Sequence, residues 1–351
     1  MMRLLVFGAG PLGSLLAARL QQGGHHVTLL ARGQRLADLR AQGIRLRSWG
    51  STNEEAVQVD LVETLQPDDV YDLVIIVMRK NSALKILPIL SDNASPAFLF
   101  LMNNAAGPTE LEEVLGTERV IIGFFGAAGY REAGKVIYLN AEPGRPGVIY
   151  MGEPTGGLSP RLQNWADELT KGRHIQVKIE EQMDAWLKYH VAILFPAFAP
   201  ALYLCANDNY RLARTRDALI LAWRGLREAL QVLKKLEIPA QPPGIRTLLY
   251  LPEPLAVSLL SRLLKNPRME VAVVKHAEVI RDEMQQLNCE FLKLVEKSGC
   301  FTPTILFLIN QFNHQAPLLP DGSRSLRMDW SGVLIPAMLL VLGVLIFILV
   351  F

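Results

Sequence analysis

The sequence has few cysteines, little net charge and no metal-binding pattern, and each shortage excludes a class of protein. Its three cysteines, Cys205, Cys289 and Cys300, are scattered and form no CxxC pair, so we expect no disulfide framework. The six histidines lack the spacing of metal ligands, and we predict no zinc or other metal site. A formal net charge of +2 over 351 residues is too small to indicate nucleic acid as a partner.

Charge is also missing from the end of the sequence. No residue from Gly332 to Phe351 is charged, and residues 333–351 form an almost unbroken apolar run. A helix of that length spans about 28 Å, close to the thickness of the hydrocarbon core of a bilayer. A buried core helix is the alternative, but this run is apolar on all its faces. We therefore predict a transmembrane helix over residues 332–351.

The residues before the predicted span indicate its orientation. Trp330 stands where an aromatic residue at a membrane interface is expected, and Arg324 and Arg327 lie close to it. Because positive charge stays on the cytoplasmic side, we predict that the folded domains face the cytoplasm. Residues 315–331 are rich in Pro, Gly, Ser and Arg and are predicted to be a linker to the membrane helix.

The remaining chain is long enough for two domains. Strand and helix patterns alternate through the first half, which predicts an α/β doubly wound (Rossmann) domain over residues 1–172. Helical periodicity dominates afterwards and predicts an all-α domain over residues 173–314. The predicted strands are residues 4–7, 26–30, 72–78, 98–102, 120–124, 136–139 and 148–151, and the clearest helices are residues 11–22, 34–41, 218–236 and 280–294.

The first predicted strand is followed by Gly8-Ala9-Gly10-Pro11-Leu12-Gly13, a GxGxxG motif that opens the first predicted helix. In a dinucleotide-binding fold, Gly8 allows the tight turn, Gly10 lets the backbone approach a pyrophosphate and Gly13 allows close packing of helix on strand. The helix N-terminus attracts the anion through its free N–H groups. The alternatives are an ordinary strand–helix turn, or a signal peptide over Met1–Leu20, which would leave the glycines unexplained.

The end of the second predicted strand indicates which dinucleotide binds. NAD sites usually carry Asp or Glu there, whereas this sequence reads Leu30-Ala31-Arg32 with no acid in reach. A carboxylate would repel a 2′-phosphate, and Arg32 can bind that group bidentately. We therefore predict NADP as the cofactor. The alternative is that Arg32 and Arg35 are solvated surface charges.

These features together resemble the ketopantoate reductase family. The run GGHHVTLLARGQRLADLRAQGIRL, residues 23–46, is similar to the segment in which the family carries an "ARG" strand end. The resemblance covers about residues 1–313. It implies that Arg79, in Met78-Arg79-Lys80, supplies the strand-end cation near a cofactor phosphate. It also implies that Asn104, in the Asn103–Gly107 segment, is the family's essential Asn at the cofactor and the reacting groups.

The resemblance assigns two further catalytic residues. Lys188 matches the lysine of an "LW(x)K" segment, and Glu283 matches the glutamate of a "TEID" segment. A cation beside the carbonyl oxygen of a 2-oxo acid would stabilise negative charge there and donate a proton, which suits Lys188. A carboxylate would keep that lysine charged and bind the product hydroxyl, which suits Glu283. Taken alone, each residue could equally be a solvated charge at the edge of a helix.

The sequence departs from the family where the substrate binds. The family has Asn at the fourth and eighth positions after the lysine, and this chain has Ala192 and Pro196. Val271 replaces a family Ser, and Asn207 is the remaining candidate for a third substrate-binding Asn. The resemblance therefore implies a substrate more apolar than ketopantoate.

We expect an NADP-dependent reductase of the 2-dehydropantoate 2-reductase type, which acts on a small 2-oxo acid or related carbonyl compound. It would be membrane-anchored and could form a homodimer. A non-catalytic, NADP-binding sensor or scaffold tethered to a membrane is the alternative from another class. A two-domain dehydrogenase of the 6-phosphogluconate or glycerol-3-phosphate type is disfavoured, because the match outside the Rossmann half is weak.

Overall fold

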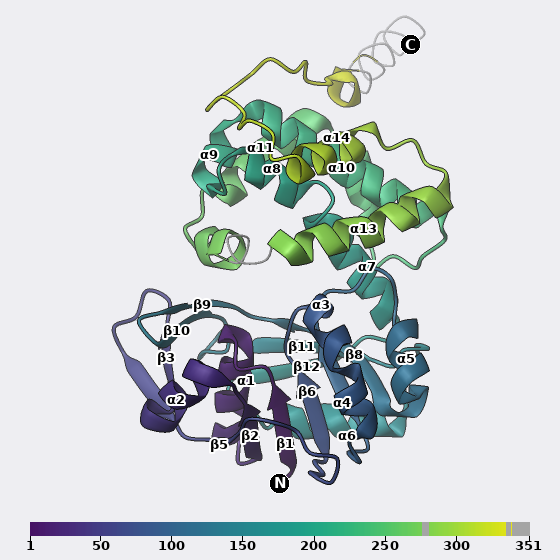
Figure 1. Cartoon of the computed structure of the whole chain (residues 1–351). Helices are drawn as coiled ribbons and strands as arrows, with labels where there is room; N and C mark the ends of the chain where they lie inside the picture. The colour runs from purple at the N-terminus through teal and green to yellow at the C-terminus, as the bar shows by residue number, and fades with distance from the viewer. Residues whose placement is uncertain (276–280, 335–337, 339–351) are drawn as a thin grey trace, which may run out of the picture. The chain divides into compact units, whose positions relative to one another are not determined.

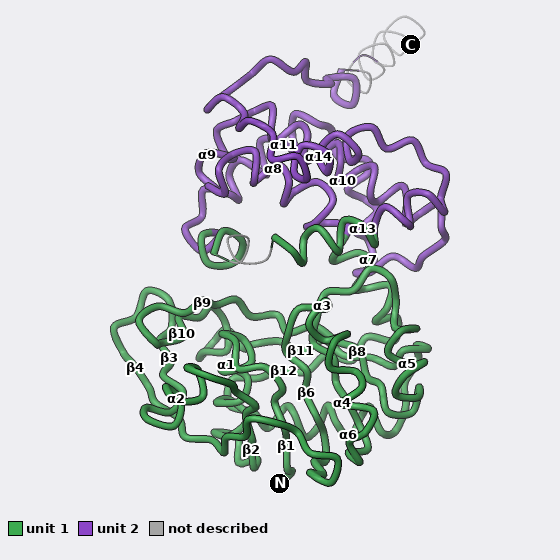
Figure 2. Tube along the Cα trace, in the orientation of Figure 1, with its two compact units in different colours: residues 1–191, 270–290 green, residues 192–269, 291–351 purple. Residues whose placement is uncertain are grey.

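The structure is a computed structural model that describes residues 1–275, 281–334 and 338. Within these residues the chain divides into two compact units, shown in different colours in Figure 2. The first unit comprises residues 1–191 and 270–290, and the second comprises residues 192–269 and 291–351.

The first unit extends beyond the predicted domain end at residue 172. Helix α7, Met183–Leu194, begins by packing Met183 and Leu187 into the core of the first unit. Helix α13, Arg281–Ser298, starts in the same unit and ends in the second. The sequence pattern shows that these segments are helical, but not which core their apolar residues join.

The first unit is built on a sheet that is eight-stranded in the described residues, with the order β12-β11-β8-β7-β6-β1-β2-β5 (Figure 1). Strands β8 and β11 are antiparallel, and the other neighbouring pairs of this sheet are parallel. Its strands are β1 Arg3–Phe7, β2 His26–Leu30, β5 Asp60–Val62, β6 Leu73–Ile76, β7 Phe98–Leu101, β8 Val120–Gly126, β11 Gly147–Gly152 and β12 Ile175–Ile179.

Both faces of this sheet are covered, which explains why its central strands are apolar throughout. Leu4 and Val6 of β1 belong to one buried cluster, and Leu5 and Phe7 belong to another on the opposite face. Such two-sided burial is typical of parallel sheets and confirms the predicted α/β architecture. The helices of this unit, besides α7 and the start of α13, are α1 Pro11–Gln22, α2 Gly33–Gln42, α3 Lys80–Ala83, α4 Leu87–Asp92, α5 Thr109–Leu115 and α6 Pro160–Leu169.

A smaller sheet packs against α1, and most of it was not predicted. Its order is β4-β3-β10-β9, and its strands are β3 Ile44–Ser48, β4 Glu54–Val57, β9 Ala128–Glu132 and β10 Lys135–Leu139. Only β10 has a clear apolar run. Charged residues alternate with apolar ones in β3, the pattern of a half-buried strand, so this strand was predictable from the sequence although we did not predict it.

The second unit is helical, as predicted. Its helices are α8 Phe198–Leu204, α9 Asn209–Arg214, α10 Arg216–Lys235, α11 Glu253–Leu264, the second half of α13, and α14 Pro303–Asn313. The predicted stripe on α10 is buried, with Trp223, Leu230 and Leu233 inside the unit. A Cβ at Gly225 would lie 2.5 Å from the Ala197 Cβ, so this glycine allows close helix packing.

Residues 315–331 are not a free linker, because they are bound along the second unit. The backbone N–H groups of Ser325 and Leu326 donate to the Asp217 carboxylate at 2.8 and 2.9 Å. The Asp329 N–H donates to Glu253 Oε1 at 2.9 Å. We predicted a linker from composition, and composition carries no information about backbone hydrogen bonds of this kind.

The predicted transmembrane helix lies outside the described residues, apart from residues 332–334 and 338. Within the described part of the chain, one helical segment, Met183–Leu204, is long and apolar enough to cross a membrane. Of its most apolar stretch, 72% is buried inside the structure, as is usual for a helix that contributes to a core.

Candidate active site

The predicted dinucleotide turn connects β1 to α1, and each of its three glycines is needed or tolerated for a different structural reason. A Cβ at Gly8, whose φ is +125°, would lie 2.5 Å from the carbonyl oxygen of Val77. A Cβ at Gly13 would lie 1.9 Å from the Gly8 carbonyl oxygen. Nothing lies within 4 Å of a Cβ built on Gly10, the N-cap of α1. Close packing therefore requires Gly8 and Gly13, and Gly10 leaves open space where a pyrophosphate would approach.

The turn sits where the strand order changes direction. From β1 the chain continues to β2 on one side, whereas β6 and β7 lie on the other. Ligands of doubly wound sheets bind in the crevice at the carboxyl ends of strands beside such a point. The segments after β1, β6 and β7 are residues 8–13, 77–80 and 102–107, and they contain most of the predicted site residues.

Arginine side chains lie near the N-termini of α1 and α2. Arg32 is the N-cap of α2, is exposed, and has its guanidinium 5.9 Å from the centre of the Phe7 ring. Arg35 Nη2 donates to Ser14 Oγ of α1 at 3.1 Å, and Arg35 Nε is buried without a hydrogen-bond partner. Burial and the nearby charge of Arg131 lower the pKa of Arg35. Cations so arranged fit an anionic ligand, and a 2′-phosphate suits them.

Arg79, the predicted phosphate ligand, is engaged elsewhere. It forms an ion pair with Asp282 of α13, and Asn81 Nδ2 donates to the same carboxylate at 2.8 Å. Arg79 is the N-cap of α3, and both members of the ion pair are about half exposed. Binding of a phosphate by Arg79 would therefore compete with an existing carboxylate partner.

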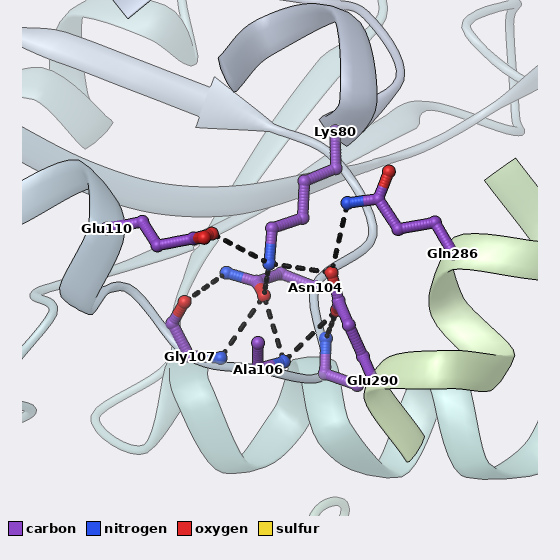
Figure 3. Close-up of polar contacts among 8 residues, drawn as sticks. Lys80, Asn104, Ala106, Gly107, Glu110, Gln286 and Glu290 are labelled. Carbon is purple, nitrogen blue, oxygen red and sulfur yellow. Dashed lines mark hydrogen bonds and ion pairs between the residues drawn. The ribbon is translucent and has the colours of Figure 1, made fainter. Parts of the chain in front are cut away.

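Lys80, rather than Arg79, is the strand-end cation that points into the unit. It is 1% exposed, and its Nζ lies 2.8 Å from both Asn104 Oδ1 and Glu290 Oε1 (Figure 3). The contact of Arg79 with a cofactor phosphate stays a prediction, and Lys80 is a second cation after the same strand. Adjacent residues at a helix start point in different directions, and only the structure shows which one is turned inward.

Asn104 shapes the turn between β7 and α5. Its Oδ1 accepts hydrogen bonds from the N–H groups of Ala106 and Gly107 at 3.1 and 3.2 Å, in addition to the bond from Lys80. Its Nδ2 donates to the Gly107 carbonyl at 2.7 Å. These contacts, drawn in Figure 3, hold residues 103–107 in one compact turn.

Lys188 lies on α7 beside this turn. A Cβ on Gly107 would come 3.6 Å from Lys188 Nζ and 3.5 Å from Asp184 Oδ1. Lys188 is mostly buried and pairs with Asp184, one helical turn earlier. Asp184 Oδ1 is buried and has no hydrogen-bond partner, so it can accept a donor from a ligand or water.

The observed ion-pair partner of Lys188 is Asp184, and not Glu283 as predicted. We expected Glu283 to keep this lysine charged, but no hydrogen bond or ion pair joins Lys188 to Glu283 among the described residues. Asp184 pairs with Lys188 instead, because positions i and i+4 of a helix are neighbours. The i, i+4 spacing of these two residues is visible in the sequence.

Glu283 reaches the same turn from α13. It is buried, and its Oε1 accepts a 3.2 Å hydrogen bond from Asn103 Nδ2. Burial raises the pKa of the Glu283 carboxyl, and the bond from Asn103 opposes this shift only in part. Asn103 Oδ1 is buried without a partner. Asn103 and Glu283 therefore form a polar pair that is incompletely satisfied by the protein alone.

The raised pKa of Glu283 predicts a pH-dependent contribution to stability. A carboxyl with a folded-state pKa above its ordinary value of 4.5 binds its proton more tightly when folded. Its stabilising effect is complete below pH 4.5 and is lost as the pH rises through the folded-state pKa. Glu283→Gln should therefore match the wild type near pH 4.5 and become relatively more stable at higher pH. Urea unfolding of both proteins across this range checks the prediction, and parallel stability curves would contradict it.

The structure thus brings three predicted catalytic residues to one turn. Asn104 is part of it, Lys188 lies beside Gly107, and Glu283 is bound to Asn103. Asn207 lies in the second unit, at the turn after α8, with a left-handed φ of +53°. Asn adopts this conformation more readily than most residues, which is a structural reason for its presence. Its contact with substrate stays a prediction.

Comparison with known proteins finds similarity to one family. Residues 4–156 match the family model described as Ketopantoate reductase PanE/ApbA. A 2-dehydropantoate 2-reductase of Archaeoglobus fulgidus is 25% identical over 292 residues, 82% of this chain and 93% of the relative. A 2-dehydropantoate 2-reductase of Mesorhizobium japonicum is 27% identical over 212 residues, 53% of this chain and 63% of the relative, so this match spans less than two thirds of that protein.

Solved structures share the fold across both units. A putative ketopantoate reductase from Ralstonia solanacearum has a TM-score of 0.72 at 19% identity, covering 90% of this chain and 97% of that one. D-mandelate dehydrogenase with NADH and anilino(oxo)acetate has a TM-score of 0.73 at 16% identity, covering 90% and 98%. At these identities the similarity supports the fold: an α/β Rossmann-like unit followed by a helical one.

Proposed function

We propose that the protein is a member of the ketopantoate reductase family, whose model matches residues 4–156, and that it is an NADPH-dependent reductase of a 2-oxo acid or related carbonyl compound. The observation that carries this proposal is the convergence of Asn104, Lys188 and Glu283 on residues 103–107. That turn follows β7 in a sheet whose first turn fits a dinucleotide. The homologues named 2-dehydropantoate 2-reductase support an oxidoreductase of this type.

In the proposed reaction, a bound dihydronicotinamide would supply a hydride to the carbonyl carbon of the substrate. The C=O double bond would become a single bond, and the oxygen would take up a proton from the Lys188 ammonium. Asp184 pairs with Lys188 and orients it, and water would return the proton to the lysine afterwards. Glu283 would hydrogen-bond the substrate, and Asn104 would hold the turn in line with the nicotinamide.

The basic residues near α1 and α2 favour NADPH. Among the described residues, no acidic side chain pairs with Arg32, and the buried Nε of Arg35 has no hydrogen-bond partner. D-mandelate dehydrogenase, which shares the fold, is described with NADH, so the fold alone does not select the cofactor. The choice therefore depends on local charge, and a 2′-phosphate complements guanidinium groups in this position.

Replacing Arg32 by alanine should weaken NADPH binding by about 1.5–3 kcal/mol, the range for a charge-assisted hydrogen bond. Arg35→Ala should act in the same direction, and NADH binding should change little in both variants. Arg40, an exposed arginine on the same helix, provides the matched control. Fluorescence titration with each cofactor measures these dissociation constants. Equal losses for NADPH and NADH, or a wild-type preference for NADH, would contradict the assignment.

The proposed substrate is a 2-oxo acid with an apolar side chain. Ala192, Pro196 and Val271 stand where the family has polar residues, and all three are buried. Because their side chains are aliphatic, they cannot donate or accept hydrogen bonds. The direct test is NADPH oxidation by the full chain against a panel of 2-oxo acids that includes ketopantoate. Reduction of at least one of them, with apolar members preferred, is expected. Tight NADPH binding without reduction of any carbonyl would favour the non-catalytic sensor.

We further propose that residues 332–351 anchor the protein in a membrane, with both folded units on the cytoplasmic side. The apolar composition of this segment and the arginines before it support the proposal. The homodimer also stays a prediction. Because residues 315–331 are bound along the second unit, an anchor at this position would leave that unit close to the membrane surface.

A further inference from the structure

Glu290, on α13, is a buried carboxylate that binds both Lys80 and the turn after β7. Its Oε1 lies 2.8 Å from Lys80 Nζ and accepts a hydrogen bond from Gln286 Nε2 at 3.2 Å. Its Oε2 accepts hydrogen bonds from the N–H groups of Ala105 and Ala106 at 3.0 and 3.2 Å. Figure 3 shows all four contacts converging on one buried carboxylate.

These bonds give the backbone N–H groups of the turn an acceptor that the turn itself does not provide. The N–H groups of Ala106 and Gly107 reach Asn104 Oδ1, but the N–H of Ala105, a fully buried residue, donates to Glu290. Without that carboxylate, a buried backbone donor would lose its acceptor, which is costly. Successive N–H groups that converge in this way form a concave site for an anion, and Glu290 occupies it.

Glu290 is also the ion-pair partner of the buried Lys80 side chain. Lys80 is enclosed, and its close oxygen partners are Asn104 Oδ1 and Glu290 Oε1. Glu110 is the other carboxylate nearby, but it is 3.6 Å away and its side chain is 58% exposed. A buried cation is tolerated when a carboxylate with good hydrogen-bond geometry neutralises it, and Glu290 meets that condition whereas Glu110 does not.

Glu290 and Glu283 connect the same helix to the same turn. They are seven residues apart on α13, two helical turns, and therefore lie on one face. Glu283 accepts from Asn103 at one end of the turn, and Glu290 accepts from Ala105 and Ala106 at its centre. Two carboxylates bound to one short segment define both the position and the register of the first half of α13.

We propose that Glu290 is a positioning residue that joins α13, Lys80 and the Asn103–Gly107 turn, and so places Glu283 and Asn104 for the reaction. The expected effect on kcat rests on the proposed function, whereas the structural role of Glu290 does not depend on it. Glu290 does not touch the substrate in this scheme. It acts by holding in one arrangement the groups that do.

Hydrogen exchange in the full chain tests the structural part without any substrate. In Glu290→Ala, the backbone amide of Ala105 should exchange about tenfold faster or more, because its acceptor is lost, and Ala106 should follow more weakly because it also donates to Asn104. Glu110→Ala, which removes the exposed carboxylate near Lys80, should leave this exchange within twofold of the wild type. If Glu290→Ala does not fold, Glu290→Met gives the same comparison, because Met keeps the side-chain length and has no acceptor oxygen. Unchanged exchange at the turn in the folded variant would overturn the proposal.

A double variant separates positioning from simple charge neutralisation. Lys80→Met with Glu290→Leu removes both charges and should recover the thermal midpoint lost in Glu290→Ala. Fast exchange at Ala105 should persist in the double variant, since its amide still lacks its acceptor. Recovery of slow exchange would show that Glu290 only neutralises Lys80 and would overturn the proposal.

The kinetic consequence is measured with a substrate that the wild type reduces. Glu290→Ala should lower kcat about tenfold or more, because small displacements of reacting groups are costly, and Glu110→Ala should not. A normal kcat in Glu290→Ala, together with fast exchange at the turn, would overturn the link to Glu283. Failure of the wild type to reduce any carbonyl would contradict the proposed function, while the exchange measurement would still decide whether Glu290 positions the turn.

Discussion

Replacing Lys188 by alanine is expected to lower kcat about a hundredfold or more, the scale of general acid catalysis. The positive charge of this lysine is most useful once negative charge develops on the substrate oxygen. Its loss should therefore act on the transition state more than on ground-state binding. The pairing of Lys188 with Asp184 holds the ammonium beside the Gly107 turn.

The measurement compares steady-state kinetics with cofactor binding. NADPH affinity of Lys188→Ala should stay near the wild-type value, because the proposed phosphate-binding groups lie at α1 and α2. Asp184→Asn should reduce kcat less, since it removes the ion-pair partner that orients Lys188 without removing the proton donor. Lys171→Ala, at an exposed ion pair with Glu168, is the control and should have normal kinetics. A near-normal kcat in Lys188→Ala would mean that this lysine is only a helix-edge charge.

Deleting the chain from Gly332 onward is expected to move the protein almost completely from the membrane fraction to the soluble fraction. The full chain should resist extraction by high salt, because insertion of an apolar helix does not depend on screened charge. The deletion leaves Asp329 bound to Glu253 and the rest of the second unit complete. It should therefore yield a folded protein with unchanged NADPH affinity.

A full-length control separates the anchor from chain length. Leu340→Lys with Leu345→Lys keeps every residue but places two charges within the apolar run, which should prevent insertion. This variant should fractionate with the soluble deletion variant. Full-length wild-type protein that stays soluble without detergent would refute membrane attachment and leave the reductase proposal untouched.

Local sequence patterns were enough to predict the architecture of the first unit and a turn that fits a dinucleotide. Apolar strands alternating with helices are a local pattern, and the glycines of residues 8–13 follow the first strand directly. Asn104 was assigned differently, through the resemblance of its segment to a family segment that also follows a strand. The architecture and the turn depend only on neighbours in the chain and on general properties of parallel sheets.

Only the tertiary structure decided which polar groups meet. Nothing local distinguishes Lys80 from Arg79, yet one is buried beside Asn104 and the other is bound to Asp282. Glu290 is 210 residues from Lys80 in the sequence, and its 2.8 Å contact requires α13 to return to the first unit. The predicted end of the first domain at residue 172 differs from the observed unit because the start of α7 packs into the core of the first unit and the start of α13 also belongs to that unit. Periodicity identifies which residues are helical and which face is apolar, but the partner of a buried charge depends on segments distant in sequence.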